Sequence, residues 1–185
     1  DLESLKSYPR VLQHLTKFKA VLSERREVEN GRIKFFQLQW PRNTNIFTGE
    51  KIVVPYRSNT NAFAYNKTEW FCRSDCYVIT QKYPTYALGY LLALLNSSLY
   101  FQWLFHRGKR KGQMLELFQI PLSEIPIKRI SGVEQKPFID LTNRILAAKR
   151  QDADTKALEL AVDKMIYDLY GLSSDESDLV LESSI

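Results

Sequence analysis

Residues 85–106 read TYALGYLLALLNSSLYFQWLFH and form the most apolar stretch of the chain. Apolar side chains occupy nearly every position, which predicts one or two helices buried on all sides rather than an amphipathic surface helix. The stretch approaches the length of a membrane span. Polar residues interrupt it at Asn96, Ser97, Ser98 and Gln102 and flank it on both sides, so buried helices are favoured over a transmembrane segment.

The rest of the chain has the composition of an ordinary globular protein, with 44% hydrophobic and 25% charged residues. Its 185 residues predict a single domain over residues 1–185 that holds a core without cross-links. The 3 Trp, 10 Tyr and 10 Phe argue against disorder. With 2 Cys and 2 His, the chain is too poor in ligands for a disulfide framework or for a zinc site without carboxylates.

The chain begins Asp1-Leu2-Glu3, with neither Met nor a signal-peptide pattern. We interpret it as a piece of a larger protein. Free cysteines are typical of a reducing compartment, so we expect a cytoplasmic protein that does not contact a membrane.

Charge is distributed unevenly along the chain. The formal net charge is +5, but residues 25–111 carry 14 Lys and Arg against 5 Asp and Glu, whereas residues 150–185 carry 3 against 9. A basic body attracts polyanions because it neutralises phosphates and releases their counterions. Nucleic acid is therefore one candidate partner, and the alternative is a solvated surface of mixed charge.

An N-terminal helix is predicted over residues 8–26. Pro9 suits its first position, and Arg25 and Arg26 suit its C-terminus. Apolar side chains recur between them at helical spacing, at Val11, Leu15, Phe18 and Leu22. Asn30-Gly31 then predicts a turn.

Residues 32–82 are predicted to form a small, mixed, β-rich region. An extended run is expected over residues 33–40, before Pro41. Residues 51–55 read Lys-Ile-Val-Val-Pro after a glycine and favour a strand, as do residues 77–80.

This region also concentrates side chains that can read DNA bases. Arg makes two hydrogen bonds to guanine, and Asn and Gln make two to adenine. Loops on a rigid scaffold commonly carry variable recognition. The candidates for base readout are Arg32, Gln37, Gln39, Arg42, Asn43, Asn45, Arg57, Asn59 and Asn61. The alternative for each Asn is that it forms a turn.

A cluster of cations follows the apolar stretch. Residues 106–112 read His-Arg-Gly-Lys-Arg-Lys-Gly, which predicts a flexible loop that binds phosphates. The candidates for phosphate contact are Lys51, Arg107, Lys109, Arg110 and Lys111. A solvated surface loop is the alternative.

The last part of the chain predicts an extended segment and then a helical scaffold over residues 136–182. Pro121 and Pro126 are expected to keep residues 117–127 extended, since proline disfavours a helix interior. Pro137 is expected to open the first C-terminal helix.

Two further helices are predicted after it. Leu158, Val162 and Met165 mark one of them, which Gly171 ends. Residues 173–176 read Ser-Ser-Asp-Glu, a capping box for a last short helix. The predicted class is α+β, with an N-terminal helix, a β-rich recognition region, buried central helices and the C-terminal scaffold.

The sequence contains no familiar catalytic motif. It has no glycine-rich phosphate loop, no GxGxxG after a strand and no GxSxG. Cys72 and Cys76 have the spacing of metal ligands, but two small, partly buried thiols are favoured. Asp140, Asp154 and Lys156 resemble a nuclease cluster only loosely, and Asp154 also suits a helix N-cap.

Several short motifs resemble those of one family. Residues 90–100 (YLLALLNSSLY) resemble its LLGLLNSKL signature, and residues 122–127 (LSEIPI) resemble the following L..IPIP, with Lys128 in place of the second proline. Residues 158–171 resemble the closing LE..ID.LVY.LYGL pattern. Ser173 and Glu176 match positions that follow it.

Upstream, Tyr8-Pro9 with Leu22 and Arg25 resembles the opening YP…L….L..R helix, and Lys51–Pro55 resembles KI..P. Together these motifs resemble the TaqI-like C-terminal specificity domain, over roughly residues 8–182. That domain is the target recognition part of type IIG restriction-modification enzymes and related adenine-N6 DNA methyltransferases.

The resemblance implies sequence-specific recognition of double-stranded DNA for catalysis by other domains. It implies a methyltransferase domain in the same chain, with an Asn/Asp-Pro-Pro-Tyr/Phe motif that is absent here. S-adenosylmethionine and Mg²⁺ would bind those other domains, and no cofactor or catalytic residue is expected in this one. The family does not indicate which residues read bases.

Two rival functions stay open at this point. One is a cryptic metal-dependent nuclease at Asp140, Asp154 and Lys156. The other is a protein-interaction module that uses aromatic side chains and the acidic C-terminal part.

Overall fold

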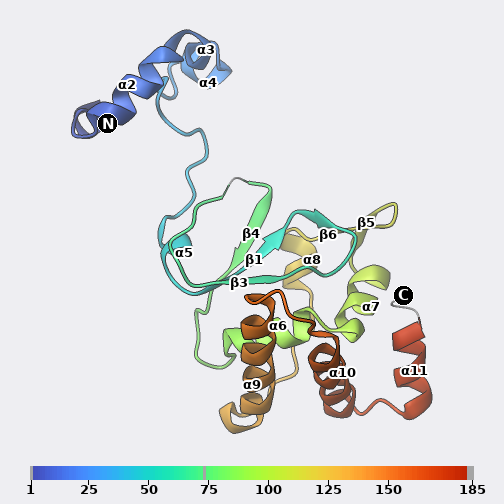
Figure 1. Ribbon diagram of the computed structural model, residues 1–185. Coiled ribbons are helices and arrows are strands. Elements are labelled where there is room, and N and C mark those ends of the chain that lie inside the picture. Colours follow the sequence, from blue (N-terminus) through green and yellow to red (C-terminus); the bar gives the residue numbers. More distant parts are fainter. Residues whose placement is uncertain (1, 73, 183–185) are drawn as a thin grey trace. The chain divides into compact units, whose positions relative to one another are not determined.

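The computed structural model describes residues 2–72 and 74–182. Its contacts divide the chain into two compact units, Asp1–Asn43 and Thr44–Ile185. The described elements mix helices with small antiparallel sheets, which confirms the α+β class (Figure 1). That residues 1–185 act as one recognition domain stays a prediction.

The described residues of the first unit form four short helices. They are α1 Leu2–Lys6, α2 Pro9–Lys17, α3 Lys19–Ser23 and α4 Arg26–Glu29. Of these, α2 and α3 replace the one helix predicted over residues 8–26. Pro9 opens α2 as expected. The helix then breaks at Phe18, whose backbone N–H donates to Leu15 and Thr16, and again at Arg25, whose ψ of 130° is extended.

The predicted extended run over residues 33–40 is wrong, because these residues form turns and bends. The guanidinium of Arg25 donates to the carbonyl oxygens of Phe35 and Gln37, at 2.7 and 3.1 Å, while its Nε bonds Leu22. One side chain thereby folds this segment back on the end of α3. A tertiary contact of this kind leaves no periodic pattern in the sequence.

The second unit begins with α5 Asn45–Thr48 and a three-stranded antiparallel sheet. The sheet has the order β3-β1-β4, made of β1 Lys51–Pro55, β3 Ala64–Asn66 and β4 Cys76–Ile79. The predictions of a strand at 51–55 and of one near 77–80 are confirmed. Ile52 and Val54 of β1 are fully buried.

A second antiparallel sheet has the order β2-β6-β5, made of β2 Arg57–Ser58, β5 Lys109–Lys111 and β6 Met114–Glu116. Tyr56 joins the two sheets. Its N–H donates to Asp75 next to β4, at 2.8 Å, and its carbonyl accepts from Leu117 next to β6, at 2.9 Å. The chain from 51 to 58 therefore supplies one strand to each sheet.

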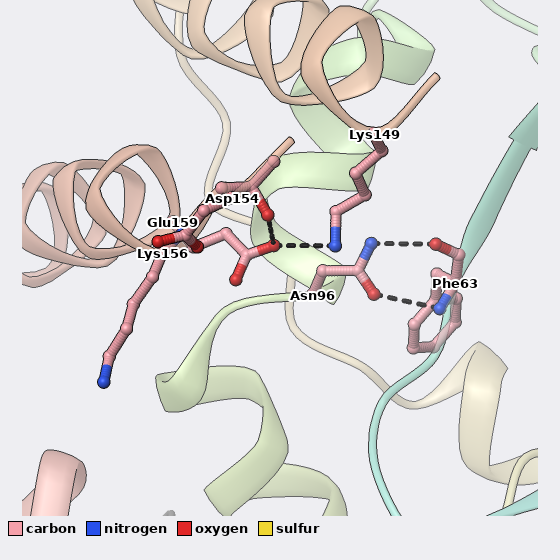
Figure 2. Close-up of polar contacts among 7 residues, drawn as sticks. Phe63, Asn96, Lys149, Asp154, Lys156 and Glu159 are labelled. Carbon is pink, nitrogen blue, oxygen red and sulfur yellow. Dashed lines mark hydrogen bonds and ion pairs between the residues drawn. The ribbon is translucent and has the colours of Figure 1, made fainter. Parts of the chain in front are cut away.

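Residues 85–106 form two helices as predicted, α6 Leu88–Leu95 and α7 Ser98–His106. Helix α6 is mostly buried, whereas α7 buries only Tyr100 and Leu104 and is otherwise partly exposed. The polar residues between them make the corner: Ser97 Oγ accepts from Tyr100 N, and the Asn96 amide bonds both backbone groups of Phe63, at 2.8 and 2.9 Å (Figure 2). Among the described residues, no helix is long and apolar enough to cross a membrane.

The region after β6 differs from the prediction at two prolines. Residues 119–123 form α8 Gln119–Ser123 instead of an extended segment. Pro121 is its third residue, where a missing N–H costs nothing because first-turn N–H groups have no partner within the helix. Helix α9 Gly132–Lys149 starts at a Ser131–Glu134 capping box, so Pro137 lies inside it rather than at its start.

The C-terminal helices follow the prediction more closely. Helix α10 Lys156–Tyr170 ends at Gly171, which adopts a left-handed φ of 72°, and α11 Ser174–Glu182 follows a Ser173–Glu176 capping box. Helices α6, α9 and α10 lie together beneath the β3-β1-β4 sheet (Figure 1). Ile166 of α10 and Leu94 of α6 belong to the same core as Ile52.

Candidate nucleic-acid interface

The cation cluster lies on a β-hairpin rather than on the flexible loop that was predicted. Strands β5 and β6 pair from Lys109 opposite Glu116 to Lys111 opposite Met114, and Gly112 makes the turn with a φ of 62°. Gly108 links α7 to β5 in close contact, since a Cβ there would lie 2.4 Å from the Leu104 carbonyl oxygen. The exposed cations are therefore held on an ordered element.

A row of three charged side chains crosses this sheet. Glu116 of β6 pairs in register with Arg57 of β2 on one side and with Lys109 of β5 on the other. Arg57 donates from Nε and Nη2 to Glu116 Oε1, at 2.9 and 2.7 Å. Lys109 Nζ lies 3.8 Å from Glu116 Oε2. The Glu116 side chain is only 8% exposed, whereas those of Arg57 and Lys109 are 37% and 63% exposed.

Aromatic rings support the same cations. Arg57 lies 4.9 Å from the ring centre of Tyr56, and Lys109 lies 4.9 Å from that of Phe118. The two rings stack on each other at 5.4 Å. Cation–π contacts of this kind restrain long side chains.

The other hairpin cations complete a positively charged surface. Arg110 lies 4.1 Å from the ring centre of Phe105, and Arg107 and Lys111 are exposed. The structure thus brings Arg57, predicted to read bases, to a sheet whose other cations were predicted to contact phosphates. We call Arg57, Lys109, Arg110 and Lys111 of this sheet, together with Arg107 just after α7, the basic sheet.

Lys51 does not fit the predicted phosphate contact. Its side chain is fully buried, and its ammonium donates to the carbonyl oxygens of Gly49 and Thr68, at 2.9 and 2.6 Å. Lys51 lies on the face of β1 opposite to Ile52 and Val54, and there it is buried against backbone carbonyls. The prediction failed because its partner Thr68 lies 17 residues away, a contact that the sequence does not reveal.

Asn61 and Gln37 are both hydrogen-bonded to the protein backbone, Asn61 through distant residues and Gln37 within its own turn. The Asn61 amide nitrogen donates to the carbonyls of Leu95 and Ser97, both at 2.8 Å, so its two hydrogens serve the α6–α7 corner and cannot pair with adenine. Gln37 Oε1 accepts from the Lys34 N–H at 2.7 Å.

The remaining base-reading candidates are divided between the two units. Arg32, Gln39, Arg42 and Asn43 belong to the first unit, and Asn45 and Asn59 to the second. Arg32, Gln39, Asn43, Asn45 and Asn59 are exposed, and Arg42 is partly buried. Their roles stay predictions.

Sequence reasoning missed the residues that order the basic sheet, namely Glu116, Tyr56, Phe118 and Phe105. One signal was present: Glu116 stands between Leu115 and Leu117, and a lone acidic residue in an apolar run indicates a charge that needs a partner. Its partner Arg57 lies 59 residues away, so the pairing could not be read from spacing.

Two of the candidate nuclease residues, Asp154 and Lys156, pair with each other at the start of a helix. Asp154 accepts from the Lys156 N–H at 3.0 Å at the start of α10, and the neighbouring Glu159 binds Lys149 at 2.8 Å (Figure 2). Within the described part of the chain, no group of three His, Cys, Asp or Glu is placed to hold a metal ion. Cys72 and Cys76 are therefore not part of such a group either.

Comparison with protein families agrees with the motifs. Residues 15–127 match the sequence model of the TaqI-like C-terminal specificity domain. The chain belongs to this family. The matched range includes α6, α7 and the whole basic sheet.

Two curated proteins resemble this specificity domain in sequence. They are the type II methyltransferases M.HincII and M.HindII of Haemophilus influenzae, each 26% identical over 149 residues and 75% of the chain. The chain spans 30% and 29% of their lengths.

One solved structure has a similar fold over almost the whole chain. It is the type IIL restriction-modification enzyme MmeI in complex with DNA, with a TM-score of 0.66 and 14% identity. The likeness covers 98% of this chain and 28% of that one.

Proposed function

We propose that this specificity domain recognises a double-stranded DNA sequence for a type IIG or type IIS restriction-modification enzyme that methylates adenine at N6. The basic sheet is the observation that carries the proposal: four exposed cations lie on strands β2 and β5 of one small sheet, and Arg107 follows α7 just before β5, in a chain that belongs to a family of specificity domains. The DNA complex of MmeI supports the choice of partner.

In this proposal, Arg107 and the hairpin cations set the position of the domain on DNA. Arg107, Lys109, Arg110 and Lys111 contact phosphates, which add affinity but carry no sequence information. An ordered hairpin suits this task because its backbone does not have to be ordered on binding.

Base readout falls to Arg57 and to polar side chains of residues 32–59. A well-formed bidentate contact discriminates against a wrong base by about 1–3 kcal/mol. Helices α6 and α7 hold the basic sheet rigid from behind.

Catalysis belongs, in this proposal, to other domains. A methyltransferase domain of the same polypeptide would bind S-adenosylmethionine and receive a flipped adenine, and Mg²⁺ would serve cleavage where a nuclease domain is present. The specificity domain itself would bring the target into place.

The test is a selection on duplexes with a randomised segment, using the 185-residue chain. The proposal predicts that repeated rounds enrich one discrete sequence motif. Binding that remains equal for all duplexes, or no binding, would contradict sequence recognition by this chain.

A further inference from the structure

The geometry of the ion pair determines which edge of Arg57 remains for another ligand. A guanidinium has five N–H donors in a fixed plane. Glu116 Oε1 accepts from Nε and from one hydrogen of Nη2. The second Nη2 hydrogen and both Nη1 hydrogens lie outside this ion pair, and together they form the end-on fork that fits guanine O6 and N7.

The surroundings restrain the direction of that fork. The Tyr56 ring lies 4.9 Å from the guanidinium carbon, and Glu116 stands directly opposite Arg57 on the neighbouring strand. The Arg57 side chain is nevertheless 37% exposed. An arginine held on one edge and on one face, with solvent access elsewhere, is preorganised for a bidentate contact.

We propose that Glu116 is a positioning residue that presents the Nη1–Nη2 edge of Arg57 to a guanine in the major groove. The inference rests on the proposed function, and it adds that a residue without DNA contact determines specificity. A buried carboxylate beside DNA is unfavourable for affinity because it repels phosphates. The role of Glu116 is then to orient Arg57. The Lys109 ammonium on the other side of Glu116 offsets the negative charge of the carboxylate.

This role gives Glu116→Gln a distinctive effect. Glutamine keeps the size of the side chain but loses the charge that holds the guanidinium. Preference for guanine at one base pair should fall by about tenfold, the scale of one bidentate contact. Affinity for unrelated duplexes should stay the same or rise, because one negative charge has been removed.

Arg57→Lys is the companion variant. It keeps the positive charge, so non-specific affinity should be retained, but it has no fork and should lose the same base preference. Lys109→Ala is the matched control on the opposite side of Glu116, and it should weaken binding to all sequences alike.

The experiment is the randomised-duplex selection, run in parallel on the parent chain and on the three variants. Thermal unfolding confirms that each is folded, and Arg57→Lys carries the test where Glu116→Gln does not fold. The ¹⁵N-edited spectrum of arginine Nε–H groups adds a readout without DNA, in which the Arg57 signal should shift and exchange faster in Glu116→Gln.

The outcomes separate the two proposals. Loss of preference at one shared guanine in Glu116→Gln and Arg57→Lys, with non-specific affinity retained, supports the positioning role. If the parent selects a motif and both folded variants select the same one, the positioning role is wrong while sequence recognition stands. If the parent selects no motif, the proposed function is wrong, and the inference with it.

Discussion

At the scale of single residues, side chains of one type have opposite surroundings in this domain. Arg57 and Lys109 are exposed on the basic sheet, whereas Lys51 is enclosed by backbone carbonyls. Asn59 is exposed, whereas Asn61 holds the α6–α7 corner. Residue type identified the candidates, but strand facing and contacts with distant residues decide which are accessible, and neither can be derived from neighbours in sequence.

Lys51→Met should therefore destabilise the domain without changing how DNA binding depends on salt. Removal of the ammonium leaves the Gly49 and Thr68 carbonyls without their donor, which costs about 1–3 kcal/mol of unfolding free energy. Urea denaturation and a salt titration of duplex binding measure the two effects. Lys67→Met, an exposed position nearby, is the control and should leave stability almost unchanged. A reduced salt slope in Lys51→Met would contradict the structural role of Lys51.

At the scale of secondary structure, elements with strong local signals were predictable. The α6–α7 pair follows from its apolar length and polar interruption, and the end of α10 follows from Gly171. Elements that depend on tertiary contacts were not: Arg25 folds residues 33–40 into turns, and Pro121 is accommodated in the first turn of α8. Asp163 of α10 shows a further dependence, because it caps α7 by accepting from Ser98 N and Ser98 Oγ, at 2.9 and 2.7 Å.

Asp163→Ala should lower the free energy of unfolding by about 1–3 kcal/mol, because the partly buried Ser98 donors lose their acceptor. Burial raises the pKa of Asp163, against the effect of its Ser98 hydrogen bonds. The native carboxyl thus takes up a proton more readily than the unfolded one, so this group costs stability as the pH rises through its pKa.

Asp163→Asn removes that charge, so its stability relative to the parent chain should improve from acidic to neutral pH. Denaturation at several pH values measures the trend. A difference between parent and Asp163→Asn that does not vary with pH would contradict the raised pKa.

Gly108→Ala should disturb the approach to the hairpin. The added Cβ would meet the Leu104 carbonyl oxygen at 2.4 Å, so the backbone between α7 and β5 must shift. Gly171→Ala is the comparison: it strains a left-handed residue but meets no atom within 4 Å, and should cost about 1–2 kcal/mol. Gly108→Ala should cost more and should also weaken DNA binding. If Gly108→Ala and Gly171→Ala change stability and DNA binding by the same amounts, Gly108 does not position the hairpin.

At the scale of the whole molecule, the charge gradient seen in the sequence has a structural counterpart. Four of the 14 cations of residues 25–111 lie on the β2-β6-β5 sheet, while the acidic residues of 150–185 lie on and around the helices α10 and α11. The family and the α+β class could be inferred from ordered motifs, because these motifs form the core helices. The division into two compact units could not, since no change in composition marks residue 43.

The chain itself should neither methylate nor cleave DNA. It lacks a methyltransferase motif, and among its described residues no three His, Cys, Asp or Glu are placed to hold a metal ion. The measurement is transfer of a labelled methyl group from S-adenosylmethionine, together with nicking of supercoiled plasmid in Mg²⁺. Activity of the purified chain in either assay would show that it contains a catalytic centre. Asp140→Asn is the companion variant, and nicking that this substitution abolishes would assign the cleavage to the candidate nuclease residues.

The most direct test of the basic sheet as the DNA-binding surface is the salt dependence of duplex binding for two triple variants of equal charge. One is Lys109→Ala, Arg110→Ala and Lys111→Ala on the hairpin. The other is Lys136→Ala, Arg144→Ala and Lys164→Ala, which removes three exposed cations of α9 and α10. We predict that the hairpin variant flattens the slope of log K against log salt by about 0.9 for each phosphate that is no longer neutralised, while the helix variant keeps the parental slope. An unchanged slope in the hairpin variant, or an equal flattening in both variants, would contradict the basic sheet as the DNA-binding surface.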